Sequence, residues 1–238
     1  MSRHPLSDPR KRRRYWQLKN NRLTKHERVI LKKLEQFFDG QKERLLERLP
    51  QDIKALEDEI YNVNEEAKIA KDIMFPALEQ VMREEGEEVA GRFGVDFVMS
   101  SEINSYLDSR TEFFTKKINE TTGKQIASEL KAAREAGEDY EQMGKRIDDL
   151  VEQTKKGRGR TIARTETHTA QQKANFEGYK QAGVETKIWT ATFQNTRDTH
   201  AALDGEEVPM DRPFSNGLMF PGDASGPPSE IVNCQCQA

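Results

Sequence analysis

The chain has 238 residues, of which 33% are charged and 34% are hydrophobic, and its mean hydropathy is −0.89. This composition is more polar than that of a typical globular domain, and it indicates long, solvated helices. The sequence contains neither an apolar run of membrane-spanning length nor the apolar segment of a signal peptide. No membrane span and no signal peptide are therefore expected. The two cysteines are too close together for an unstrained disulfide, which indicates synthesis in a reducing cytoplasm.

Positive charge is concentrated near the N-terminus. Residues 1–33 hold twelve Lys and Arg against two Asp and Glu, a net charge of +10, which leaves −13 for the rest of a chain whose total is −3. A basic segment on an acidic body is typical of a protein that binds a polyanion, and nucleic acid is the first candidate.

Residues 1–28 are predicted to form a basic, flexible arm. Adjacent cations cannot all find partners in a small fold, so a mobile, solvated tail is one interpretation. The other is a DNA-binding segment, in which the cations contact phosphates and two aromatic rings stack on a base or dock on a partner protein. The predicted DNA-binding residues are Arg10, Lys11, Arg12, Arg13, Arg14, Tyr15 and Trp16.

The middle of the chain is predicted to be helical, as a long helical region at residues 29–94 and a helical domain at residues 95–185. Apolar residues recur there at steps of three and four. Such a stripe is far more often a core or a seam between helices than a functional site. Breaks in the helices are expected at Gly40, Pro50 and Pro76.

The last predicted helix, at residues 160–182, carries polar residues on more than one face. Arg160, Arg164 and His168 lie four apart and share one face, whereas Glu166 points elsewhere. A catalytic cluster is one interpretation. We favour an ordered polar network that ties this helix to the C-terminal segment, because buried charges require partners whether or not they react.

Residues 186–238 are predicted to form a small, loop-rich α+β module. Residues 186–193 are β-branched and aromatic, which favours a strand, and residues 208–210 and 218–220 are further short extended runs. Its apolar content is low, so we expect the module to pack on the helix at residues 160–182. The predicted fold class is therefore mostly α, with long amphipathic helices followed by a small α+β module.

The only two cysteines of the chain, Cys234 and Cys236, are candidate metal ligands together with His200. Thiolates and imidazole are the usual ligands of zinc, which takes four ligands in a structural site. The candidates for a fourth ligand are Asp198, Asp204, Asp223, His168 and water. The competing interpretation is a hydrogen-bonded histidine beside two small, buried thiols. We favour that interpretation, so no cofactor is expected and zinc is the alternative.

Several unusual segments occur in a distinctive order in the C-terminal half. They are RTIARTE at 160–166, Trp189, RDTHAALDG at 197–205, FSNGLMFPGD at 214–223 and EIVNCQC at 230–236. Together they resemble the phage Mu F-like head morphogenesis family of minor capsid proteins, and the resemblance covers about residues 110–238.

This resemblance implies a virion component that lies in the interior of the phage head and is synthesised in the host cytoplasm. The implied partners are the portal protein, the major capsid or scaffolding protein and packaged double-stranded DNA, with no membrane contact. The implied role is in head assembly, DNA packaging or ejection. The family has no established enzyme activity, so we expect that this protein is not an enzyme.

The resemblance also bears on the metal question. Some family members carry a Cys-x2-Cys where this chain has residues 197–200, and a His-Pro before the final Asn-Cys-x-Cys. By position, the three candidate ligands match and the other two ligand positions are lost. We hypothesise that Arg197, paired with Asp204 or Glu230, replaces the cross-link that a metal would make. This adds Arg197 and Asp204 to the predicted structural network.

Two other functions stay open on the sequence alone. In one, the C-terminal module is a metal-dependent hydrolase, a nuclease or a toxin-like enzyme domain, although no recognisable motif spacing is present. Its candidate residues would be Glu166, His168, Asp198, His200 and Asp204. The other is a plain helical scaffold, which a compact tail rich in Trp, Gly, Pro and Cys argues against.

Overall fold

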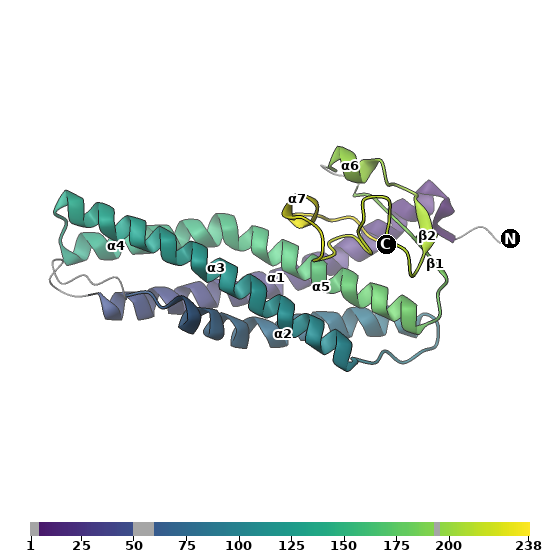
Figure 1. Ribbon diagram of the computed structural model, residues 1–238, viewed down its shortest axis with the longest axis horizontal. Coiled ribbons are helices and arrows are strands. Elements are labelled where there is room, and N and C mark those ends of the chain that lie inside the picture. The colour runs from purple at the N-terminus through teal and green to yellow at the C-terminus, as the bar shows by residue number, and fades with distance from the viewer. Residues whose placement is uncertain (1–4, 50–59, 193–195) are drawn as a thin grey trace. The chain divides into compact units, whose positions relative to one another are not determined.

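The computed structural model describes residues 5–49, 60–192 and 196–238, and Figure 1 shows its ribbon. In chain order the elements are a 3-10 turn (Pro5–Ser7), α1 (Pro9–Arg48), α2 (Val63–Gly91), α3 (Ser101–Ala136), α4 (Tyr140–Thr154), a π-helical segment (Lys155–Gly159), α5 (Arg160–Gln181), β1 (Thr186–Ile188), α6 (Asp198–Ala201), β2 (Glu207–Pro209) and α7 (Pro228–Ile231). The predicted fold class is confirmed. None of the described helices combines the length and the apolar character needed to cross a membrane.

Helices α1 and α2 continue through two positions where the sequence predicted breaks. Gly40 lies inside α1, and Pro76 lies inside α2. A proline costs a helix interior roughly 3 kcal/mol, because its nitrogen cannot donate and its ring crowds the preceding turn. Its neighbours Met74 and Ala77 are buried, and this packing offsets the cost. Pro50, the third predicted break, lies outside the described residues.

The N-terminal segment is helical from Pro9 onward, where the sequence predicted a flexible arm over residues 1–28. The prediction treated the cations as one solvated run, but a helix sorts them onto two faces. Arg12, Trp16 and Lys19 recur at steps of four and three, and all three are buried. Residues 9–28 are therefore ordered by the packing of one face of α1.

The chain divides into two compact units, and α1, α2, α3 and, by its first residue, α5 contribute to both. Unit 1 consists of Met1–Ile30, Leu78–Asn104 and Thr161–Ala238, and unit 2 consists of Leu31–Ala77 and Ser105–Arg160. Neither unit is continuous in the sequence. The units thus differ from the four consecutive parts that the sequence suggested.

Unit 2 combines an apolar core with a buried polar cluster. Gln41 of α1 donates to Asn119 of α3 at 2.8 Å, and the Tyr61 hydroxyl donates to the same Asn119 oxygen at 2.5 Å. Arg44 donates two hydrogen bonds to Glu66 of α2, of 2.8 and 2.7 Å. Because buried polar groups require partners, this cluster fixes how the three helices pair within the unit. The apolar core contains Leu45, Leu49, Ile126, Leu130, Ala133, Met143 and Ile147.

In unit 1 the C-terminal module lies beside α5 and the first part of α1 (Figure 1). Strand β1 pairs antiparallel with β2, with Lys187 opposite Val208. An isolated bridge joins Thr190 to Gln237 and so brings the last residues of the chain back to the strand. The apolar cluster of the module contains Trp189, Ala191, Leu203, Phe214, Leu218, Cys234 and Cys236.

Candidate functional site

Helix α5 is polar, and yet it is buried on nearly all of its faces. The C-terminal module covers part of it: the Thr169 hydroxyl donates to the Gly222 carbonyl at 3.1 Å, and the Thr165 hydroxyl accepts the backbone N–H of Asn233 at 3.1 Å. These bonds give polar groups of α5 the partners that burial requires. The helix is therefore a platform on which the module is held.

The first part of α1 also reaches α5 and the module. The Trp16 indole N–H donates to the Gln235 carbonyl at 2.9 Å. The Tyr15 hydroxyl lies 2.8 Å from the Tyr179 hydroxyl of α5. The two rings that the sequence assigned to DNA stacking are thus buried in contacts within the protein, which corrects that assignment.

His200, Cys234 and Cys236 converge in the module, where the sequence proposed them as candidate metal ligands. The Nδ1 atom of His200 lies 3.6 Å from the Sγ of Cys234 and 3.5 Å from the Sγ of Cys236. The three ligand atoms all lie within 4.8 Å of one another. All three side chains are buried, and both thiols are free of disulfides.

Two further contacts orient the imidazole of His200. Its Nε2 lies 2.7 Å from Oε2 of Glu230 on α7. The indole of Trp189 meets the imidazole edge to face, with ring centroids 5.1 Å apart and planes at 78°. An ionised carboxylate only accepts hydrogen bonds, so the proton of a neutral imidazole lies on Nε2. Nδ1 faces the two sulfurs, with a lone pair in the neutral ring and with an N–H that donates to Sγ of Cys236 when the ring is protonated.

The local electrostatics separate the two thiols. The hydrogen bond with Cys234 lowers the pKa of Cys236 to about 5, and His200 lowers it further against the effect of burial. The pKa of Cys234 is raised well above its usual value by the hydrogen bond with Cys236 and by burial. Burial lowers the pKa of His200, but its hydrogen bonds with Cys236 and Glu230 outweigh that effect and raise it. Cys236 is therefore a thiolate at neutral pH, the form in which cysteine binds metal.

The donor atoms fit a zinc ion. Tetrahedral zinc, with Zn–S of about 2.3 Å and Zn–N of about 2.0–2.1 Å, places nitrogen and sulfur ligands about 3.6 Å apart. The observed separations of 3.6 and 3.5 Å agree with that edge. Among the described residues, only His200, Cys234 and Cys236 form a cluster of side chains that could hold a metal ion. Asp223, a candidate fourth ligand, instead accepts the backbone N–H groups of Met219 and Ser225, each at 3.0 Å.

The predicted pairing of Arg197 is not found. Arg197 donates to the carbonyl of Val232. Asp204 pairs with Arg12 of α1 at 2.9 Å, and Glu230 is engaged by the imidazole described above. The prediction considered only the C-terminal segment, whereas the partner of Asp204 lies 192 residues away in the sequence.

The other members of the predicted network differ in their surroundings. Arg160 is exposed, Arg164 forms an ion pair with Glu27 of α1 at 3.4 Å, and Glu166 is buried. Asp198, a candidate of the enzyme alternative, is exposed at the start of α6. The residues proposed for the structural network and for the enzyme alternative therefore do not all come together in one site.

His168 ties α5 to the metal-ligand segment. It is fully buried, and its Nε2 lies 2.7 Å from the carbonyl oxygen of Cys236. Burial lowers the pKa of His168 to about 4, so the ring is neutral at pH 7 and donates its N–H to that carbonyl. The predicted link between this helix and the C-terminal module therefore runs through His168.

A buried ion cluster in unit 1 was missed by the sequence analysis. The Nζ of Lys19 lies 2.6 Å from Glu88, 3.0 Å from Asn175 and 3.4 Å from Glu85. The available signal was the position of Lys19 three residues after Trp16, on the face of α1 that also buries Leu23. A lysine on such a face indicates an acidic partner on the neighbouring helix.

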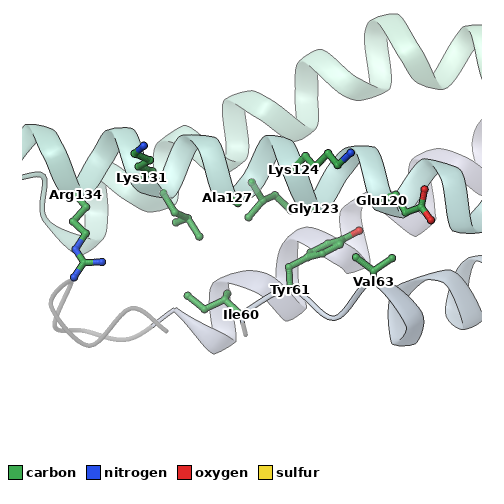
Figure 2. Close-up of a pocket in the computed structure, with 11 residues that line it drawn as sticks. Ile60, Tyr61, Val63, Glu120, Gly123, Lys124, Ala127, Lys131 and Arg134 are labelled. Atoms are coloured by element: carbon green, nitrogen blue, oxygen red, sulfur yellow. The ribbon is translucent and has the colours of Figure 1, made fainter. Parts of the chain in front are cut away.

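Unit 2 holds a groove between residues 60–63 and α3. Figure 2 shows Tyr61 and Ile60 across from α3, which contributes Lys124, Lys131 and Arg134 to the lining. The cavity has a volume of about 710 Å³. None of the site residues proposed from the sequence lines it.

The family described as "Phage Mu protein F like protein" matches residues 124–238, which confirms the resemblance found in the sequence and supports a role of the phage head morphogenesis type. NAD(+)--arginine ADP-ribosyltransferase EFV of Enterococcus faecalis (strain ATCC 700802 / V583) is 37% identical over 107 residues. That match covers 42% of this chain and only 22% of the relative. No solved structure matches the chain.

Proposed function

Because residues 124–238 match the Phage Mu protein F like family, we propose that this protein is a minor capsid component of a tailed phage that acts in head morphogenesis. The family match is the observation that carries the proposal. The matched segment includes α5, the C-terminal module and the convergent side chains of His200, Cys234 and Cys236. Its described residues are densely hydrogen-bonded, which suits a component of an assembled particle.

Within this proposal the protein lies inside the head. Its partners there are the portal protein, the major capsid or scaffolding protein and the packaged double-stranded DNA. The exposed face of α1 supports the DNA contact, because four cations lie on it. They are Arg10, Lys11, Arg13 and Arg14. Such a face binds DNA phosphates without recognising the base sequence, which suits a protein that contacts packaged DNA of any sequence.

We propose that the role is structural and not enzymatic. Two of the candidate catalytic groups are engaged in contacts that hold the fold, since His168 donates to the Cys236 carbonyl and Asp204 pairs with Arg12. ADP-ribosyltransferase is the name of a relative of which the match covers 22%, and we do not transfer that activity to this chain.

Cross-linking mass spectrometry of intact phage heads tests this proposal. We expect the protein to be present in purified particles and to form cross-links with the portal protein through exposed lysines of α3, such as Lys116 and Lys124. Heads assembled without the protein serve as the control, and we expect fewer of them to be filled with DNA. Particles that lack the protein at every stage of assembly, or normal yields of filled heads without it, would contradict the proposal.

A further inference from the structure

We propose that Glu230 positions His200 as an Nδ1 ligand of a zinc ion, with Cys234 and Cys236 as the other protein ligands. A cross-link made by metal then joins α6 to the C-terminal segment, since His200 and Cys234 lie 34 residues apart in the sequence. This inference is independent of the proposed role in the phage head. It is carried by the geometry of four side chains and by the surroundings that hold them.

The imidazole is oriented as a ligand before any ion binds. The Glu230 carboxylate, 2.7 Å from Nε2, holds the ring proton on that atom and directs the Nδ1 lone pair toward the sulfurs. Histidines that bind metal usually donate their second ring N–H to a carboxylate or a carbonyl, which fixes the tautomer and raises the basicity of the ligand. Trp189 limits rotation of the ring from the side.

The two cysteines are also held in place by groups outside the centre. Asn233, directly before Cys234, has a φ of +59°, and its backbone N–H donates to Thr165 of α5. Asparagine tolerates this left-handed conformation better than most residues. The carbonyl of Cys236 accepts the N–H of His168 at 2.7 Å. Helix α5 therefore supports both ends of the Cys-x-Cys segment.

The burial of the centre closes it to substrates and so favours a structural role, even though a closed structural site has four protein ligands and the described residues supply three. His200, Cys234 and Cys236 are each 2% exposed or less. Among the described residues, Asp204 and Asp223 are engaged elsewhere, so three protein ligands leave one position for a ligand from outside this set, such as water. A site of this kind adds stability because the unfolded chain does not gather its ligands.

Metal binding by the purified full-length chain tests the inference. We expect one Zn²⁺ per chain by elemental analysis, and a thiolate-to-metal charge-transfer band when Co²⁺ replaces it. Glu230→Ala should weaken Zn²⁺ binding about 10–100-fold in competition with a chromophoric chelator. Glu230→Gln, which keeps an acceptor for the Nε2 proton but loses the charge, should weaken it less. Asp211→Ala, at an exposed acid of the same module, is the matched control and should bind as the wild type does.

Three results of the binding experiments would overturn the inference outright. They are a wild-type chain that binds no Zn²⁺, a Co²⁺ complex without the thiolate band, and a Glu230→Ala variant with unchanged affinity. If Glu230→Ala does not fold, the Glu230→Gln variant decides, and equal affinity to wild type at equal helix content would remove the positioning role. Removal of Zn²⁺ from the wild type by a chelator should lower its Tm, and an unchanged Tm would contradict the structural role.

Discussion

The stability of unit 1 should depend on pH through one buried carboxylate, that of Glu85. Glu85 accepts a hydrogen bond from Arg22 at 2.6 Å, lies 3.0 Å from His26 Nε2 and faces Lys19 at 3.4 Å. Burial alone would raise the pKa of Glu85. The hydrogen bond of His26 and the charges of Lys19 and Arg22 outweigh burial and lower that pKa to about 2.

This depressed pKa predicts how the stability of the fold depends on pH. A carboxyl group with a lower pKa in the folded state stabilises the fold fully above its unfolded pKa of about 4.3, and the contribution is lost as the pH falls through 2. Glu85→Gln should therefore reduce the free energy of unfolding by about 3 kcal/mol at pH 7. The difference from the wild type should shrink as the pH approaches 2. Urea unfolding at a series of pH values measures both quantities.

Glu87→Gln is the matched control, because Glu87 lies two residues away on α2 and is exposed. It should change the free energy of unfolding by less than about 0.5 kcal/mol at any pH. If the loss in Glu85→Gln were the same at pH 7 and near pH 2, the ion cluster would not be its cause.

The residues of the candidate centre differ in how far the sequence revealed them. Rarity and ligand chemistry were enough to select His200 and the two cysteines. Glu230 was considered only as a partner for Arg197, because its contact with His200 depends on where α6 and α7 meet in space. Sequence spacing carries little information about contacts between short elements that loops connect.

In helix α1, some residues of the basic segment are buried in the fold and others are exposed to solvent. Arg12 and Lys19 lie on the buried face with Trp16, whereas the cations that fall between them are exposed. The sequence analysis did not recognise the helical spacing of these buried residues. It searched for apolar residues at helical spacing, whereas this face of α1 is made largely of charged and aromatic residues. Helices α3 and α4 were predicted correctly as helical, because apolar residues such as Ile118, Ile126 and Ile147 recur on their buried faces.

The exposed cations of α1 predict nonspecific DNA binding. Replacing Arg10, Lys11, Arg13 and Arg14 together with Gln should weaken binding to duplexes of unrelated sequence. It should also reduce the slope of log K against log salt by roughly 3–4, since each lost phosphate contact contributes about 0.9. Fluorescence anisotropy over a series of salt concentrations measures both effects.

A control variant that loses the same number of positive charges elsewhere tests whether DNA binding depends on the exposed face of α1 or only on net charge. Gln replacements of four exposed lysines in unit 2 remove the same charge and should leave the slope nearly unchanged. These lysines are Lys116, Lys124, Lys131 and Lys145. If both variants lost DNA affinity equally, net charge would account for the binding. If the α1 variant lost no affinity, its exposed face would not be the DNA-binding surface.

For the whole molecule, the sequence predicted the kinds of element but not their grouping. It proposed consecutive parts, whereas unit 1 combines the beginning, the middle and the end of the chain. The pairings that build unit 1 join residues far apart in the sequence, as in the ion pair between Arg12 and Asp204. Local periodicity determines helices, and such pairings arise only from how the helices meet.

The contact between the first helix and the last residues of the chain gives a prediction for this long-range assembly. Trp16→Ala removes a buried indole and its hydrogen bond to the Gln235 carbonyl, which should cost about 3–5 kcal/mol. Hydrogen exchange should then accelerate in α5 and in residues 196–238, because the indole ties α1 to Gln235 of the module and the neighbouring Tyr15 ties α1 to Tyr179 of α5. Leu18→Ala, at an exposed neighbour on α1, should leave exchange unchanged. Unaltered protection in Trp16→Ala would show that the C-terminal module holds its fold without α1.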